Sequence, residues 1–338
     1  MKRINLALQG GGAHGAFTWG VLDRILEDER IEIAAMSGTS AGAMNGAALK
    51  AGMAKGGRAG AKENLDWFWQ QVGALREDAV LGWLNAIAPD TPLLAAAMTH
   101  SPINAVIDMT TRMMSPYAQG ALYKNPLAEI VAKFEYGAVC SKAGPALFVG
   151  ATNVRTGKIK VFSGDGITGD ALMASACLPT LFQAVEIDGE AYWDGGYTGN
   201  PALFPLFDRT LPEDIMVINI NPLHRDAVPT DTKSIQNRIN EISFNSSLLR
   251  ELRAIKFVKR LINDGTVGPE SMRNVLVHMV SDDALMNDLN VTTKSVANPV
   301  ILARLKAAGR AAADTFLATH YDDIGQRDTV DLEAMFMA

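Results

Sequence analysis

A serine between two glycines, directly after a short apolar run, is the feature that most constrains the fold. The run at 31–36 predicts a buried strand, and the small residues at 41–50 predict a helix. A strand-to-helix turn at Gly38-Thr-Ser40-Ala-Gly42 strains the serine backbone and exposes its hydroxyl, while the glycines prevent clashes between strand and helix. The pattern predicts a nucleophile elbow with Ser40 as nucleophile, above the N-terminus of its own helix. A plain turn in a chain rich in small residues is the alternative.

The segments before this turn alternate between strand and helix patterns. Residues 4–8 predict a buried first strand, a glycine-rich loop follows at 10–16, and residues 17–29 predict an amphipathic helix. Strands alternating with helices are typical of a parallel sheet with crossover connections. We therefore expect an α/β fold with a central, mostly parallel sheet.

The remaining segments extend this pattern within one expected domain, 1–330, followed by a loosely ordered tail at 331–338. Residues 51–60 predict a linker and 63–72 an aromatic-rich helix, whereas 75–120 lacks any strand pattern. We interpret 75–120 as an apolar helical insertion, either a cap or acyl-chain pocket or plain helical packing. Further strands are predicted at 146–152, 158–162, 185–187, 191–193, 215–220 and 275–280, and further helices at 125–134, 169–177 and 301–317.

The longest periodic segment, 231–262, predicts an amphipathic helix with a basic polar side. From residue 233 to 262 seven lysines and arginines stand against two glutamates, an excess of five. Such a helix can pack on the sheet with a solvated charged face, or lie on an anionic membrane surface. The apolar positions at helical spacing are Ile235, Ile239, Ile242, Leu249, Leu252, Ile255, Val258 and Leu261.

Composition excludes several classes of protein. The 338 residues are 48% hydrophobic and 20% charged, which suits a globular core, and the net charge of -6 argues against a nucleic-acid partner. Only two cysteines occur, Cys140 and Cys177, a number that suits a reducing compartment. No window approaches the roughly 20 apolar residues of a membrane span. We expect a cytoplasmic protein with at most peripheral membrane contact, and self-association stays open.

Acyl transfer requires a nucleophile, a base and donors for the oxyanion, and all three are predicted at strand ends. The loop Gly10-Gly11-Gly12 follows the first strand, so its unhindered amides would face the same crevice as Ser40. Asp194 ends a predicted strand and precedes Gly195 and Gly196, which leave access to its carboxylate.

The five histidines offer no clear base for a Ser-His-Asp triad. His278 is predicted within a strand, and His14 within the glycine loop, where we expect an exposed side chain. The remaining three, His100, His224 and His320, lie in the insertion or near element ends. The simpler prediction is a dyad in which Asp194 accepts the Ser40 proton directly.

Four motifs together carry a family resemblance. They are Gly10-x-Gly12-x-x-Gly15, Gly38-Thr-Ser40-Ala-Gly42, Ala174-Ser-Ala-Cys-Leu-Pro179 and Asp194-Gly-Gly196. In this order and approximate spacing, most densely over 4–50 and 146–205, the chain resembles the patatin-like phospholipases. The resemblance implies a three-layer α/β/α fold and metal-free, cofactor-free hydrolysis of lipid acyl esters by a Ser40–Asp194 dyad. It also implies an oxyanion hole of the Gly10 to Gly12 amides, whereas 75–120 and the chain after about 225 match nothing transferable.

Other functions fit parts of the pattern. A glycine-rich loop between strand and helix also suits a dinucleotide-binding site, but Glu32 lies near the start of its strand and not at the end where a ribose would bind. A non-catalytic lipid-binding or partner-binding module would not need the glycine loop, Ser40 and Asp194 together. A thioesterase, an esterase of short soluble esters or polyesters, and an acyltransferase remain alternatives with the same dyad.

Overall fold

The computed structural model describes residues 1–75, 115–118, 125–268, 270–289 and 298–337. Its strands are β1 (Lys2–Leu8), β2 (Ile31–Thr39), β3 (Ala146–Asn153), β4 (Ile159–Ser163), β5 (Val185–Ile187), β6 (Glu190–Asp194), β7 (Asp214–Ile218) and β8 (Leu276–Val280). They form one eight-stranded sheet in the order β5-β6-β3-β2-β1-β7-β8, with β4 paired to β3. Strands β3, β2, β1, β7 and β8 run parallel, whereas β4, β5 and β6 pair antiparallel. The mostly parallel sheet is confirmed.

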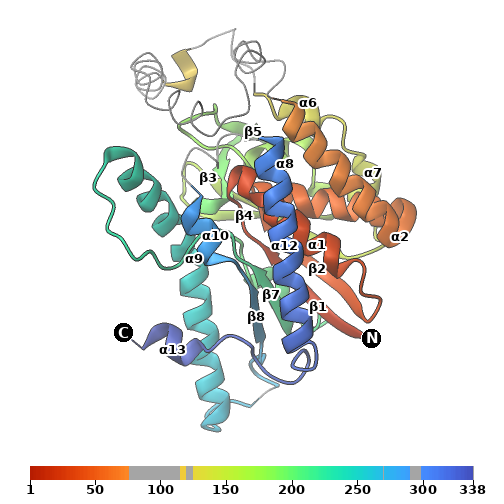
Figure 1. The fold of residues 1–338 in the computed structure, drawn as a ribbon, viewed down its shortest axis with the longest axis vertical. Coiled ribbons are helices and arrows are strands. Elements are labelled where there is room, and N and C mark those ends of the chain that lie inside the picture. Colours follow the sequence, from red (N-terminus) through yellow and green to blue (C-terminus); the bar gives the residue numbers. More distant parts are fainter. Residues whose placement is uncertain (76–114, 119–124, 269, 290–297, 338) are drawn as a thin grey trace.

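Helices cover both faces of this sheet. They are α1 (Gly15–Ile25), α2 (Ala41–Ala74), α6 (Ala128–Val131), α7 (Tyr136–Val139), α8 (Gly169–Ser175), α9 (Thr232–Asn263), α10 (Asp283–Asp288), α12 (Pro299–His320) and α13 (Leu332–Phe336). The alternation along β1 separates two cores: Leu6 and Leu8 pack with α1, α2 and α12, and Ala7 packs with α9. Figure 1 shows α12 beside α1, with α9 on the other side of the strands. The fold is therefore a three-layer α/β/α arrangement.

The predicted linker at 51–60 is wrong, because these residues belong to α2. The helix is interrupted only at Gly56 and Gly57, whose φ angles are -141° and +59°. On either side of the break the chain packs closely, since a Cβ on Gly52 would lie 2.2 Å from the carbonyl oxygen of Gly60. The small residues that resemble a linker therefore allow two helical segments to approach each other.

Three further predictions need correction. The helix predicted at 125–134 is reduced to α6. The tail at 331–338, predicted to be loosely ordered, forms α13, in which Leu332 is buried and Glu333 pairs with Lys256 at 2.7 Å. Helix α9 forms as predicted, but its apolar positions divide between two faces. Leu252 and Ile255 are buried, whereas the first three isoleucines are exposed. The insertion at 75–120 lies almost entirely outside the described residues.

None of the described helices is both long enough and apolar enough to cross a membrane.

Candidate active site

Strand β3 brings Ser40 and Asp194 together, although they are far apart in the chain. Thr39, the last residue of β2, pairs with Gly150 of β3. Asp194, the last residue of β6, pairs with the next β3 residue, Ala151. Because both strands end beside adjacent residues of one strand, Ser40 and Asp194 meet at the same edge of the sheet.

The turn at Ser40 has the geometry of a nucleophile elbow. Ser40 has φ 54° and ψ -123°, a conformation that costs a non-glycine residue about 1–3 kcal/mol. A Cβ on Gly42 would lie 2.1 Å from the carbonyl oxygen of Leu8, and one on Gly38 would lie 2.7 Å from the Gly42 carbonyl. Glycine is therefore required at Gly42 for the helix start to pack against β1, and at Gly38 for the strand to approach the helix start.

The Asp194 carboxyl is buried and hydrogen-bonded to the candidate nucleophile. Its residue is 1% exposed, and it accepts hydrogen bonds from the Ser40 hydroxyl and, at 2.8 Å, from the Gly196 amide. Burial raises the pKa of Asp194 to about 7, although both hydrogen bonds act to lower it. A carboxyl with a pKa near neutrality is suited to accept and return a proton during catalysis.

The two glycines after Asp194 are needed for close contact. A Cβ on Gly195 would lie 2.3 Å from the Gly150 carbonyl oxygen, and one on Gly196 would lie 3.0 Å from the Asp194 Oδ1 atom. Side chains at these positions would therefore displace Asp194 from β3 or block its carboxyl.

The glycine loop lies directly against Ser40, but its first amide is occupied. A Cβ on Gly10 would lie 2.7 Å from the Ser40 Cβ atom. The Gly10 amide donates to the Asn200 Oδ1 atom at 2.7 Å, so in this structure it is not free for an oxyanion. For Gly11 and Gly12 the oxyanion-hole role stays a prediction, and Gly12 adopts φ 59°. Gly15 serves packing, since a Cβ there would lie 2.6 Å from the Ala41 Cβ atom.

Asn200 holds the glycine loop, a role that the sequence did not reveal. Besides accepting from the Gly10 amide, its Nδ2 atom donates to the Gly10 carbonyl oxygen at 3.3 Å, and Asn221 donates to the same oxygen at 2.8 Å. Gln9 extends this buried network by donating to Asn245 at 3.2 Å. Gly10 is thus held at both its amide nitrogen and its carbonyl oxygen. Asn200 follows Asp194 by only six residues, but no pattern marks its side chain as inward-facing.

Ser175 fixes the backbone of the candidate nucleophile. It accepts a hydrogen bond from the Ser40 amide at 2.9 Å and donates to the Gly150 carbonyl oxygen at 2.6 Å. The same carbonyl group contacts the Gly195 backbone, so Ser175 links the elbow to the loop after Asp194. Ser175 belongs to the motif Ala174–Pro179, whose presence was the available signal for this position.

The histidines occupy other roles. His14, expected to be exposed, is 1% exposed, because the short 3-10 turn η1 (Gly12–His14) leads directly into α1 and carries the side chain inward. His278 lies in β8 as predicted and pairs with Asp214 at 2.9 Å. His320 contacts Asp323 at 2.8 Å, and the His224 side chain is 81% exposed. His100 lies outside the described residues.

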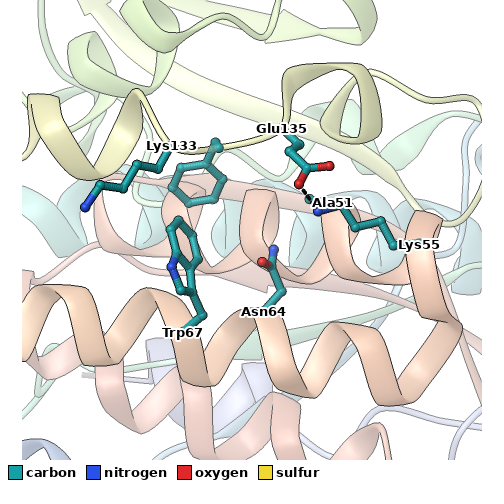
Figure 2. Close-up of a pocket in the computed structure, with 7 residues that line it drawn as sticks. Ala51, Lys55, Asn64, Trp67, Lys133 and Glu135 are labelled. Atoms are coloured by element: carbon teal, nitrogen blue, oxygen red, sulfur yellow. Dashed lines mark ion pairs between the residues drawn. The ribbon is translucent and has the colours of Figure 1, made fainter.

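A cavity of about 310 Å³ lies away from these residues, between α2 and the segment around α6 and α7 (Figure 2). Trp67 and Phe134 line it, and Lys55 forms an ion pair with Glu135 at its edge. None of the candidate catalytic residues lines this cavity, so it is not where an acyl group would meet Ser40.

Comparison with known proteins agrees with these motifs. The family model described as "Patatin-like phospholipase" matches residues 6–207. Among solved structures, VipD from Legionella pneumophila matches with 16% sequence identity and a TM-score of 0.41, covering 95% of this chain and 67% of that chain. A search of curated proteins finds no match. Since the family model covers more than half of the 338 residues, the chain belongs to the patatin-like phospholipase family.

Proposed function

We propose that the protein is a serine acyl hydrolase of lipid esters, of phospholipase A or lysophospholipase type, with Ser40 as nucleophile and Asp194 as its base. The observation that carries the proposal is the hydrogen bond between the Ser40 hydroxyl and the buried Asp194 carboxyl, whose pKa burial raises to about 7. Membership in a family of lipid hydrolases supports the substrate class. A single catalytic domain over 1–330 is part of this proposal.

Catalysis proceeds through an acyl-enzyme. Ser40 Oγ attacks the ester carbonyl carbon while its proton passes to Asp194, and the carbonyl oxygen becomes an oxyanion. Collapse of this intermediate breaks the ester bond, and the departing alcohol takes the proton from Asp194. Water then attacks the acyl-Ser40 ester with Asp194 as base, and the second collapse releases the fatty acid and returns the proton to Ser40.

Backbone amides stabilise the oxyanion in this proposal. Gly11 and Gly12 are the donors from the glycine loop, which the contact of Gly10 with Ser40 holds beside the nucleophile. The first amides of a helix lack intrahelical partners, so the Ala41 amide at the start of α2 is available as a further donor. Removing one such donor from an acyl-transfer enzyme costs about 2.7–4 kcal/mol of transition-state stabilisation.

The substrate in this proposal is a lipid that the enzyme reaches by peripheral contact with a membrane, without metal or cofactor. The two cysteines support a reducing compartment and hence the cytoplasm, since Cys140 and Cys177 are unpaired.

Two substitutions test the dyad. Ser40→Ala and Asp194→Asn should each lower hydrolysis of phospholipid, lysophospholipid and short-chain esters by roughly 10⁴-fold or more, because each removes a partner in the same proton transfer. Circular dichroism should show an unchanged fold. Ser163→Ala and Asp165→Asn, at exposed positions, are matched controls that should retain full activity.

Activity that survives Ser40→Ala or Asp194→Asn would rule out the dyad. A wild-type chain that turns over no ester and no thioester would instead favour a non-catalytic lipid-binding module. Faster turnover of monomeric soluble esters than of aggregated lipids would identify a carboxylesterase, a preference for thioesters a thioesterase, and transfer to added alcohols an acyltransferase.

A further inference from the structure

The outer face of α9 carries three large apolar side chains that are about half exposed to solvent. Ile235, Ile239 and Ile242 are 41%, 54% and 55% exposed, and their spacing of four and three residues places them on one side of the helix. The opposite side faces the core, where Leu248 and Leu252 are fully buried. Single exposed apolar residues are ordinary, but three along one helix face indicate a contact surface.

Three exposed arginines continue this line toward the C-terminal end of α9. Arg250, Arg253 and Arg260 recur at the same helical spacing, so they lie on the side that also carries the isoleucines. We call the six residues the α9 stripe: Ile235, Ile239, Ile242, Arg250, Arg253 and Arg260. Figure 1 shows α9 on the left of the molecule, on the side away from α2, with α13 beside its lower part.

The exposed charge of α9 is cationic. Neither glutamate of the helix is exposed: Glu241 is buried against Arg225 and Arg238, and Glu251 accepts backbone hydrogen bonds from the segment at 203–204. Among the described side chains of α9, the stripe arginines are therefore exposed without a neighbouring carboxylate on the helix, and Arg253 also lies over the Phe336 ring of α13, 5.0 Å from its centroid.

Two other basic residues of α9 do not belong to this surface. Lys256 pairs with Glu333 at 2.7 Å, and Lys259 pairs with Asp328 at 2.9 Å. These ion pairs tie the C-terminal segment to α9, so their charges are already matched within the chain. The basic character expected of this helix is thus divided between structural ion pairs and the stripe.

The inner face of α9 contacts the candidate active site. Phe244 packs edge-on against Tyr197 with ring centroids 5.2 Å apart, beside the loop that follows Asp194. Ser247 accepts a hydrogen bond from the Asn200 amide at 3.1 Å. A surface that touches the stripe would therefore lie about one helix diameter, roughly 10 Å, from the catalytic edge of the sheet.

We propose that the α9 stripe is the surface on which the enzyme docks to an anionic phospholipid membrane. The isoleucines enter the boundary between headgroups and acyl chains, and the arginines bind lipid phosphates, a combination that matches both the apolar and the charged layers of a membrane. From Ile235 to Arg260 the stripe extends for about 37 Å along the helix. The proposal rests on the proposed lipid substrate, because docking here holds the site beside the layer that contains it.

Vesicle co-sedimentation tests the stripe. The full chain with Ser40→Ala, which keeps the vesicles intact, is mixed with vesicles of phosphatidylcholine with or without phosphatidylglycerol. We expect binding to the anionic vesicles. Ile235→Gln, Ile239→Gln and Ile242→Gln together should weaken it by about tenfold or more. Arg250→Gln, Arg253→Gln and Arg260→Gln together should weaken it on the order of 100-fold and reduce its salt dependence.

A control changes one apolar residue and two arginines elsewhere on the surface. Val300→Gln, Arg155→Gln and Arg304→Gln alter side chains that are 75%, 58% and 56% exposed, and together they should leave vesicle binding unchanged. With Ser40 present, both stripe variants should hydrolyse a monomeric short-chain ester at the wild-type rate. The hydrolysis rate separates the two proposals. If neither the wild type nor the stripe variants hydrolyse the ester, the proposed function is wrong, whereas the docking proposal is judged by vesicle binding alone.

Three results would overturn the docking proposal. The first is vesicle binding by the stripe variants that equals that of the Ser40→Ala chain, and the second is no vesicle binding by the Ser40→Ala chain itself. The third is a wild-type dimer, measured by sedimentation velocity without vesicles, that becomes a monomer in the isoleucine variant, because the stripe would then be an interface between copies of the chain.

Discussion

At the scale of single residues, the site depends on burying a carboxyl beside a strained serine. Asp194 would have a low pKa in water, but removal of solvent raises it to about 7, and the Ser40 hydroxyl and Gly196 amide offset only part of this shift. Ser40 is held at positive φ, where its amide meets Ser175. The buried carboxyl of Asp194 and the positive φ of Ser40 are each unfavourable by themselves, and packing of the surrounding fold holds both in place.

The pKa of Asp194 predicts the pH dependence of hydrolysis. As the proposed base, Asp194 must be ionised to accept the Ser40 proton, so kcat/KM for a monomeric ester should fall below about pH 7, approaching a tenfold loss per pH unit. Above that pH the carboxylate is formed and the rate should level off. A pH-rate profile from 5 to 9 measures this, and a flat profile over that range would contradict the assignment.

Glu251 supplies the control for this profile. Burial raises its pKa to about 7 as well, although the Leu203 and Phe204 amides act to lower it. Glu251 contacts no candidate catalytic residue in the described hydrogen bonds, so Glu251→Gln should keep the acidic fall in rate. If Glu251→Gln loses the acidic fall in rate, the fall is caused by ionisation of Glu251 and not of Asp194.

At the scale of elements, local patterns predicted some structures well because the turn chemistry decides them. Asp188-Gly189, a pair of residues typical of two-residue hairpin turns, joins β5 to β6, and both residues adopt positive φ, at 52° and 77°. The elbow at Ser40 follows similarly from its flanking glycines. In these places the conformation depends on a few adjacent residues, so the sequence was sufficient.

Where packing decides the structure, the same patterns were ambiguous. Small residues at 51–60 are typical of a linker, yet they also let two halves of α2 approach closely. Helical periodicity in α9 located an apolar line but could not say whether Ile239 or Leu252 faces the sheet. Asn200 contacts Gly10 only after β1 and the loop after β6 have assembled, so no local signal marks it.

The break in α2 makes a prediction about two adjacent exposed glycines. Gly57 has φ +59° and ψ -144°, so Gly57→Ala should destabilise the chain by about 1–3 kcal/mol. Gly56 has φ -141°, which other residues adopt, and a Cβ there meets nothing within 4 Å, so Gly56→Ala is the matched control with little expected cost. Urea unfolding measures both. Equal stability of the two variants would show that the helix continues without this break.

At the scale of the whole molecule, the sheet order creates the site. Strands β2 and β6 are far apart in sequence, and their shared pairing with β3 makes Ser40 and Asp194 neighbours. Helix α9 lies between this end of the sheet and solvent. Its inner face contacts the loops around Asp194 and Asn200, and its outer face carries the α9 stripe. In the two proposals, the inner face of α9 therefore supports the loops beside the candidate catalytic residues, and its outer face contacts the membrane.

The central claim is that Ser40 is the nucleophile and that Asp194 activates it. Labelling with a fluorophosphonate, followed by mass-spectrometric mapping of the modified peptide, tests this most directly. We expect one adduct, on Ser40, whose extent matches the loss of ester hydrolysis, and much slower labelling of Asp194→Asn. An adduct on a different residue, or hydrolysis that persists after Ser40 is fully modified, would contradict the account.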